Sequence, residues 1–331
     1  MSTPPFWPRT SPHFLRVRVA VRRALATLEY PPTVFVGLSG GADSLALIAA
    51  VCAETRGTKT AVTALCVDHQ LQPGSREVAQ RAAAQAEAWG ANTDIITVDV
   101  DTSHPDGMEA AARRARYQGF AQRAGAAPVM VAHTANDQAE NLLLSSLRGH
   151  VNGMSFEAFI EGARLIRPLL SVRRADTLGA CEEVGADIWH DPHNEREDFR
   201  RVAIRKRVLP LLEEIHGGDV VAVLGASASD IAHDDAFLHS LVPDVAAAEE
   251  LVCADLAGMA QPVRKRVIAR WLTANDASPT RAALAAIDAL ISDWSGQGNV
   301  AVADMTAKNR GARLEVQRDG GKLRLLRFHA P

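Results

Sequence analysis

A short glycine-containing stretch after the first apolar run of the chain has residues suited to holding a phosphate. Residues 33–44 read TVFVGLSGGADS. Gly40 and Gly41 would let the backbone approach a phosphate closely, and the N-terminus of a following helix would offer free N–H groups. Asp43 would repel an anion directly, so its useful role is to hold a Mg²⁺ that bridges phosphate oxygens. A tight turn in which Asp43 or Ser44 caps the helix is the alternative.

Other polar residues follow apolar runs later in the chain. Asp68 and His69 come after a second run, and His133 comes after a fourth. Asp137 and Glu140 lie three residues apart and would share one face of a helix. Carboxylates placed in this way could recognise the ammonium groups of a substrate and take up a proton. A purely structural role, as a cap or a buried histidine, is the alternative for each.

The elements that would position these residues alternate in type. Apolar runs lie at 34–38, 61–67, 93–98 and 129–132, and alanine-rich helical segments lie at 44–54, 75–89 and 109–123. This alternation predicts an α/β fold with a doubly wound parallel sheet and helices on both faces. Ligands bind at the carboxyl ends of the strands in such sheets. We therefore expect the polar residues to converge at that edge.

The rest of the chain predicts a smaller second domain. Composition shifts near residue 216, so we place the domains at 1–216, with a leading helix in 1–30, and at 217–331. The basic amphipathic helix at 12–28 either packs on the first domain or contacts a membrane surface or RNA. Further helices are expected at 172–183, 200–209 (ending at Pro210), 220–241, 246–256, 261–273 and 280–292. Three short strands with an Asp319-Gly320-Gly321 turn predict a C-terminal β-hairpin after the helices.

Composition narrows the class of protein. The chain has 331 residues, a net charge of −3, 47% hydrophobic residues and 23% charged residues, as in ordinary globular proteins. The charge argues only weakly against nucleic acid, because a basic groove can lie on an acidic body. Four scattered cysteines without CxxC spacing favour a reducing compartment over a zinc site or a redox dithiol. No stretch approaches about 20 apolar residues and no signal-peptide core is present, so we expect a cytoplasmic protein without a membrane span.

The motifs resemble those of one superfamily and, within it, one family. Ser39–Ser44 (SGGADS) resembles the pyrophosphate-binding loop, or PP-loop, of the Rossmann-like N-type ATP pyrophosphatases. Val67–Leu71 (VDHQL) resembles the VDHxLR signature of the tRNA(Ile)-lysidine synthases. Other segments similar to that family's motifs are EAAARRARY at 109–117, AHTANDQAE at 132–140, LRG at 147–149, RPLL at 167–170 and DPHN at 191–194, then Arg201, Arg205 and Leu209-Pro210. The similarity is dense over 33–212 and looser beyond, where the chain resembles the family's first C-terminal domain.

The resemblance implies an enzyme, a ligase that forms a C–N bond in tRNA. Members of the family use ATP and Mg²⁺ to adenylate the wobble cytidine of the isoleucine tRNA with a CAU anticodon, and they release pyrophosphate. The ε-amine of L-lysine then displaces AMP to give lysidine, which changes codon reading from AUG to AUA and amino-acid identity from Met to Ile. The expected cofactors are ATP and Mg²⁺, and the expected partners are L-lysine and this tRNA. The oligomeric state is left open, with a homodimer as one alternative.

The same resemblance gives roles to individual residues. ATP would be bound by Ser39, Gly40, Gly41, Ala42, Asp43, Ser44, Asp68, His69 and Arg113, and Asp43 would also hold Mg²⁺. The expected catalytic residues are Asp43, His133, Asp137, Glu140 and Arg205, with His133 facing the α-phosphate. Asp137 and Glu140 would bind lysine. Arg113, Arg201 and Arg205 would contact a phosphate or the lysine carboxylate, with a solvated surface role as the alternative for each.

Two positions depart from the family's pattern. Asn136 stands where an aspartate is usual, so this position should be neither charged nor bound to metal. Gln72 stands where arginine or lysine is common, which weakens any anion contact there.

Basic residues outside the site would have to hold the tRNA through its phosphates. The candidates are Arg164, Arg167, Arg173 and Arg174 in the first domain, Arg264, Lys265, Arg266 and Arg270 on a later helix, and Arg310, Arg313, Arg318, Lys322, Arg324 and Arg327 on the hairpin. We expect the second domain to set the register of the tRNA. A solvated basic face is the alternative.

Other functions fit these residues less well. Synthesis of 2-thiocytidine in tRNA would need CxxC pairs, which the sequence lacks, and an ammonia-fed synthetase would need a glutaminase that the chain does not encode. A sensor that binds ATP without chemistry would leave the Asp137 and Glu140 pair without a purpose.

Overall fold

The computed structural model describes residues 7–8, 10–70, 74–101, 107–190, 200–245, 248–305 and 313–328. The chain forms two compact units, Met1–Ala232 and His233–Pro331. The division falls inside helix α9 (Val220–Ser240), later in the chain than the expected boundary at residue 216.

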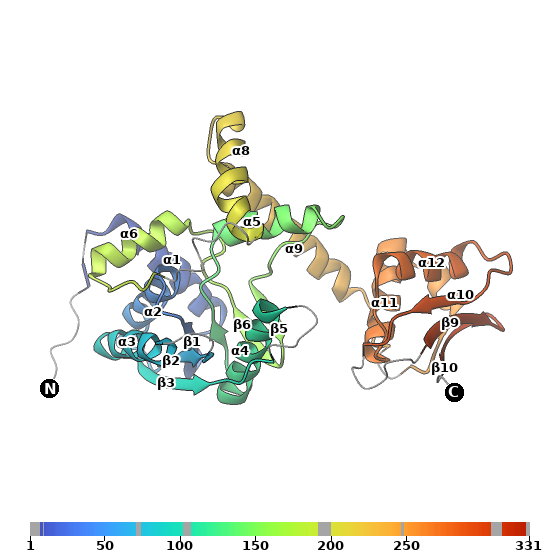
Figure 1. The fold of residues 1–331 in the computed structure, drawn as a ribbon, viewed down its shortest axis with the longest axis horizontal. Coiled ribbons are helices and arrows are strands. Elements are labelled where there is room, and N and C mark those ends of the chain that lie inside the picture. The colour runs from blue at the N-terminus through green and yellow to red at the C-terminus, as the bar shows by residue number, and fades with distance from the viewer. Residues whose placement is uncertain are drawn as a thin grey trace. The chain divides into compact units, whose positions relative to one another are not determined.

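A six-stranded sheet forms the centre of the first unit, with strand order β3-β2-β1-β4-β6-β5 (Figure 1). Its strands are β1 (Thr33–Leu38), β2 (Ala61–Asp68), β3 (Asn92–Thr97), β4 (Val129–Met130), β5 (Glu157–Ile160) and β6 (Ala163–Ile166). All pairings are parallel except that of β5 with β6, a hairpin that the sequence did not predict. The expected α/β fold with a doubly wound sheet is confirmed.

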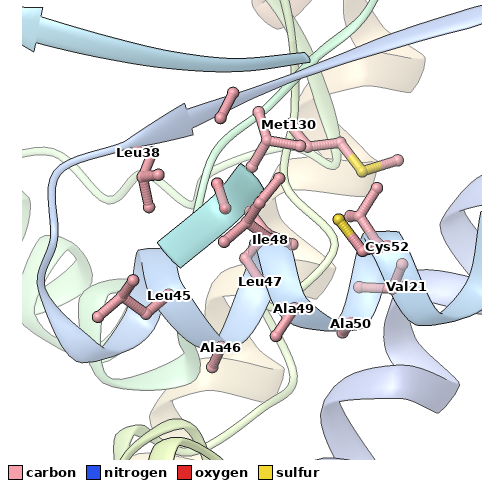
Figure 2. Packing of buried hydrophobic residues seen from close by; sticks show 14 of the residues in the cluster. Val21, Leu38, Leu45, Ala46, Leu47, Ile48, Ala49, Ala50, Cys52 and Met130 are labelled. Carbon is pink, nitrogen blue, oxygen red and sulfur yellow. The ribbon is translucent and has the colours of Figure 1, made fainter. Parts of the chain in front are cut away.

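Helices cover both faces of this sheet. On one face α2 (Ala42–Thr55) and α3 (Ser75–Ala88) pack against the alternate side chains of β1 that begin with Val34. Figure 2 shows Leu38, Ile48 and Met130 in the apolar layer between the sheet and α2. On the other face lies α4 (Met108–Ala124), which contributes Phe120 to a second apolar cluster.

The basic helix at the N-terminus packs on this unit. Helix α1 (Pro12–Thr27) contacts α2 and α6 (Arg174–Val184), and it buries Phe14, Val17 and Val21 completely. Beside this buried face, Arg18 and Arg22 form ion pairs with Glu54 of α2. The structure therefore supports the expected packing role for this helix.

A helical segment begins after His133 and contains Asp137. Helix α5 (Ala135–Ser146) is followed, after the β5–β6 hairpin and α6, by α7 (Arg200–Ala203), a π-helical turn (Ile204–Val208) and α8 (Leu209–His216). The expected end of the basic helix at Pro210 is wrong, since the helical run continues to His216. Pro210 lies in the first turn of α8, where a missing N–H costs little.

The second unit combines helices with a four-stranded antiparallel sheet of order β7-β10-β9-β8. Its elements after α9 are β7 (Glu250–Val252), α10 (Cys253–Ala257), α11 (Gln261–Ala274), α12 (Arg281–Ser292), β8 (Val300–Val302), β9 (Arg313–Asp319) and β10 (Lys322–Phe328). The C-terminal hairpin is confirmed. The single helix expected over 246–256 is wrong, because Leu251 extends the sheet beside Leu323 before α10 begins. No helix within the described ranges is long and apolar enough to cross a membrane.

Candidate active site at the carboxyl edge of the sheet

The glycine-containing loop joins β1 to α2 and leaves the start of the helix open. Gly40 has a φ of +82°, a value that suits glycine, and Gly41 is the N-cap of α2 without any side-chain capping bond. The Ser44 hydroxyl donates to the Gly41 carbonyl at 2.9 Å and accepts from the Ser39 amide at 3.2 Å. Neither Asp43 nor Ser44 caps the helix, so the alternative of a simple capped turn loses its support. The loop keeps free N–H groups at a helix N-terminus, the arrangement that binds anions.

Asp68 closes the turn at the end of β2. It is buried, and its Oδ1 accepts the Gln70 amide at 3.1 Å and the Ser75 hydroxyl at 2.6 Å. This geometry is that of a strand-end cap, the structural alternative for this residue.

His69 next to it is a neutral hydrogen-bonding group. Arg116 donates to its Nε2 at 3.3 Å, so the ring proton belongs on Nδ1, which is buried without a partner among the described residues. Burial and then Arg116 lower the pKa of His69 to about 4. An unused donor of this kind suits the nucleoside side of the edge.

His133 follows β4 and is also neutral. Burial is the main cause that lowers its pKa to about 3, and Arg167 and Arg113 add to this effect while Asp137 opposes it. Its Nδ1 is buried and has no partner in the described part of the chain. The ring can therefore donate to or accept from a ligand, but it carries no charge near neutral pH.

Arg167 follows β6, the strand that pairs with β4, and is buried. Its Nη1 donates to the Ser155 carbonyl at 2.7 Å, and its Nε has no partner among the described residues. Burial lowers the pKa of this arginine. We expected Arg167 at the surface as a tRNA contact, and this placement corrects that prediction. The sequence signal for this buried placement was the position of the arginine, directly after the apolar residues of a central strand.

Arg174 is the residue that joins the two halves of the site. Its Nε lies 3.2 Å from Asp43 Oδ2, its Nη2 lies 3.0 Å from Asp137 Oδ1, and its Nη1 lies 3.2 Å from Glu140 Oε1. We predicted it instead as a tRNA contact. One local signal marks this residue as unusual, since a cation in the first turn of a helix is unfavourable unless carboxylates compensate for the helix dipole, but it does not indicate which carboxylates these are.

Two further arginines surround Glu140, whose side chain is completely buried. Arg205 donates through Nε to Oε1 at 2.7 Å and through Nη2 to Oε2 at 3.1 Å. Arg201 Nε lies 3.4 Å from Oε2. The predicted residues Glu140, Arg201 and Arg205 thus form one cluster, held by α5, α7 and the π-helical turn.

The pKa values of the two aspartates shift in opposite directions. Burial raises the pKa of Asp43, and Arg174 and the Thr177 hydroxyl offset only part of that effect. Burial also acts on Asp137, but Arg174, His133 and the bonds from Thr134 together lower its pKa to about 2. Asp137 is therefore a fixed negative charge rather than a proton acceptor at neutral pH.

Asp43 could serve as one ligand of a Mg²⁺ ion. It lies in the first turn of α2 directly after the loop, where phosphate oxygens would complete the coordination sphere. The described residues contain no group of three or more acidic, histidine or cysteine ligands, and Mg²⁺ bound to a nucleotide does not need one. Asn136 accepts the Arg174 amide at 2.9 Å, consistent with its expected neutral role.

The remaining candidate residues are more scattered. The Arg113 guanidinium lies 4.9 Å from the centre of the Tyr117 ring, on an exposed part of α4. In the second unit Arg264 is buried and pairs with Asp288 at 2.6 Å. It therefore stabilises the core and is not the tRNA contact that we predicted. Arg270 is half-exposed and pairs with Asp244 at 3.2 Å. Gln72, Arg310 and the predicted 191–194 motif lie outside the described residues.

Comparisons with known proteins identify the family of this chain. Residues 17–212 match the family model of the PP-loop domain, and residues 251–323 match that of the TilS substrate binding domain. A tRNA(Ile)-lysidine synthase from Corynebacterium diphtheriae is 51% identical over 96% of this chain and 98% of its own length. The tRNA(Ile)-lysidine synthase of Rhodococcus jostii is 44% identical over 94% of this chain and 95% of its own.

A solved structure supports the fold independently. The U34-tRNA thiolase NcsA from Methanococcus maripaludis with its [4Fe-4S] cluster aligns with a TM-score of 0.53 at 16% identity, covering 65% of this chain and 79% of that one. This likeness concerns the fold alone. Because its sequence relatives are tRNA(Ile)-lysidine synthases and both domains match their family models, the chain belongs to the tRNA(Ile)-lysidine synthase family.

Proposed function

We propose that this protein ligates L-lysine to the wobble cytidine of the isoleucine tRNA with a CAU anticodon, using ATP. The observation that carries the proposal is the meeting of the open loop, Asp43, and the Asp137 and Glu140 pair at one edge of the sheet, joined by Arg174. An ATP-binding protein without a second substrate would not need the buried carboxylates of α5.

Activation of the cytidine belongs to the loop side of this edge. A bond forms between the cytidine carbonyl oxygen and the α-phosphorus of ATP, and the bond to pyrophosphate breaks. The free N–H groups at the start of α2 would stabilise the charge that develops on the leaving pyrophosphate. Mg²⁺ held by Asp43 would supply further positive charge there. His133 would donate a hydrogen bond to the α-phosphate as a neutral ring.

Attack by lysine belongs to the α5 side. Asp137 and Glu140 would bind an ammonium group of lysine and so place the ε-amine near the adenylated carbon, where the amine displaces AMP. Because the pKa of Asp137 is only about 2, this residue orients the substrate but does not remove its proton. The match to a TilS substrate binding domain supports a role of the second unit in holding the tRNA.

A labelling experiment tests the proposal. The full chain is incubated with ATP, Mg²⁺, labelled lysine and CAU-anticodon isoleucine tRNA, and label on the tRNA is measured together with AMP and pyrophosphate. We expect label only when all four components are present, and a loss of at least about 10³-fold in Asp43→Ala. Pyrophosphate release without label would contradict lysine as the nucleophile, and release of neither product would contradict an adenylating enzyme.

A further inference from the structure

The carboxylates that should bind lysine are already occupied in the structure. Asp137 Oδ2 accepts two bonds from Thr134 at 2.8 Å, and its Oδ1 faces Arg174. Both oxygens of Glu140 face arginines. Since the Glu140 side chain has no exposed surface, an ammonium group reaches it only if one of these arginines moves.

The geometry identifies which arginine that is. Arg205 holds Glu140 through a two-point contact at 2.7 and 3.1 Å, the stronger arrangement. Arg201 faces Glu140 alone. Arg174 is the residue that bridges Glu140 and Asp137, so a lysine ammonium that bridges the same two acids must take its position.

Arg174 can keep one of its carboxylate contacts when it releases Asp137 and Glu140. Its Nε lies 3.2 Å from Asp43, and its backbone amide is held by Asn136. The side chain can therefore keep its contact with Asp43 while its two Nη groups release the acids. The guanidinium is half-buried, and leaving it without any carboxylate would be costly.

We propose that Arg174 is a placeholder for the lysine ammonium: it pairs with Asp137 and Glu140 in the structure and yields them to lysine while it stays on Asp43. The proposal rests on the proposed function, because it takes lysine as the ligand of these two acids. In this role Arg174 competes with the substrate for the two acids, which a residue that only supports the fold would not do.

Lysine affinity distinguishes these roles. Equilibrium dialysis with labelled lysine is carried out on the full chain with the tRNA and the α,β-methylene analogue of ATP present, so that neither chemical step occurs. Removing the competitor in Arg174→Gln should tighten lysine binding about tenfold, a change of about 1.4 kcal/mol. Arg174→Lys should tighten it less than Arg174→Gln does, because the remaining ammonium still competes for the acids, although it pairs with fewer of them at a time than the guanidinium fork.

Arg16 gives a matched control. It pairs at 2.6 Å with Asp176, which lies on the same helix α6 as Arg174 and is none of the three acids, so Arg16→Gln should leave lysine affinity unchanged. Thermal unfolding of each variant identifies any that does not fold, and Arg174→Lys, which keeps the charge, then carries the test.

The outcomes separate the two proposals. Unchanged or weaker lysine binding in both Arg174 variants would overturn the placeholder role, and weaker binding would instead indicate that Arg174 holds the lysine carboxylate. Wild-type protein that retains no lysine under these conditions would contradict the proposed function itself.

Discussion

At the scale of single residues, the site contains a buried cation whose charge no described carboxylate neutralises. Arg167 bonds to the Ser155 carbonyl and has a free Nε beside the neutral His133. A buried charge without a counter-ion costs stability, so it is best explained by an anion that arrives with the substrates. The substrates offer phosphates and the carboxylate of lysine. Because Arg167 lies beside His133, which we place at the α-phosphate, a phosphate of ATP is the expected partner.

This explanation predicts opposite effects on stability and activity. Arg167→Met should leave the midpoint of urea unfolding unchanged or raise it, while it lowers kcat/KM for ATP by about 10²-fold. Urea titration and steady-state kinetics measure the two. A variant that loses stability in proportion to activity would show that Arg167 only supports the loop at Ser155.

The two neutral histidines predict how stability depends on pH. His69 and His133 have pKa values of about 4 and about 3 in the folded chain, whereas an unfolded histidine titrates near 6.5. Below pH 6.5 the unfolded state therefore binds more protons, and stability is lost as the pH falls from about 6.5 toward 4. The slope should approach 1.4 kcal/mol per pH unit for each residue.

Urea unfolding at pH 7.5 and pH 5.5 measures this slope. The His69→Asn and His133→Asn variants serve as controls, and each should reduce the loss of stability at pH 5.5. An equally steep loss in both variants would assign the pH dependence to other groups.

The sequence predicted which residues form the site better than it predicted which of them contact one another. The loop, His133, Asp137 and Glu140 all stand in motifs, and they do converge at the carboxyl edge of the sheet. Arg174 lies 131 residues from Asp43 in the chain, and no local pattern specifies that a helix start so remote will bring a guanidinium between three acids. Such a contact is determined by tertiary packing.

At the scale of elements, the strands with long apolar runs were predictable and the short ones were not. Buried parallel strands such as β1 and β2 read as nearly continuous apolar segments. The β5–β6 hairpin lies at the edge of the sheet, and Arg164 pairs with Glu157 across it at 2.6 Å, so its sequence is mixed. The turn at Glu161-Gly162, where both residues have positive φ, was the available signal.

Gly37 shows how one strand residue sets the packing of a helix. A Cβ at this position would lie 2.9 Å from the ring of Phe120, so α4 approaches the sheet only because β1 has no side chain there. Gly37→Ala should therefore destabilise the protein by about 1–3 kcal/mol, measured by urea unfolding. Because β1 leads into the loop, ATP binding should weaken as well.

A second substitution identifies the cause. Phe120→Leu removes the ring atoms that the new methyl group would meet, so the double variant should be more stable than the sum of the two single effects predicts. Strict additivity would assign the loss to the strand backbone and contradict the steric explanation.

At the scale of the whole molecule, several of the basic residues predicted to hold the tRNA are paired with carboxylates in the structure. In the second unit Lys322 and Arg324 pair with Glu250, Arg313 pairs with Glu315, and Arg270 pairs with Asp244. Surface pairs of this kind contribute little to stability and exchange easily for phosphates. The basic residues that we expect to hold the tRNA would therefore have to release these carboxylates when the tRNA binds.

The salt dependence of tRNA binding tests whether these exposed residues contact phosphates. If Arg270, Arg313 and Arg324 each contact one phosphate, the triple glutamine variant should lower the slope of log K against log[salt] by about 2 to 3, because each contact contributes about 0.7–0.9. Arg123, an exposed arginine of α4 that pairs with Asp94, provides the control, and Arg123→Gln should leave the slope unchanged. An unchanged slope in the triple variant would assign the grip to the first unit, whereas a reduced slope with intact lysine binding would show that holding the tRNA and binding the amino acid are separate tasks of the two units.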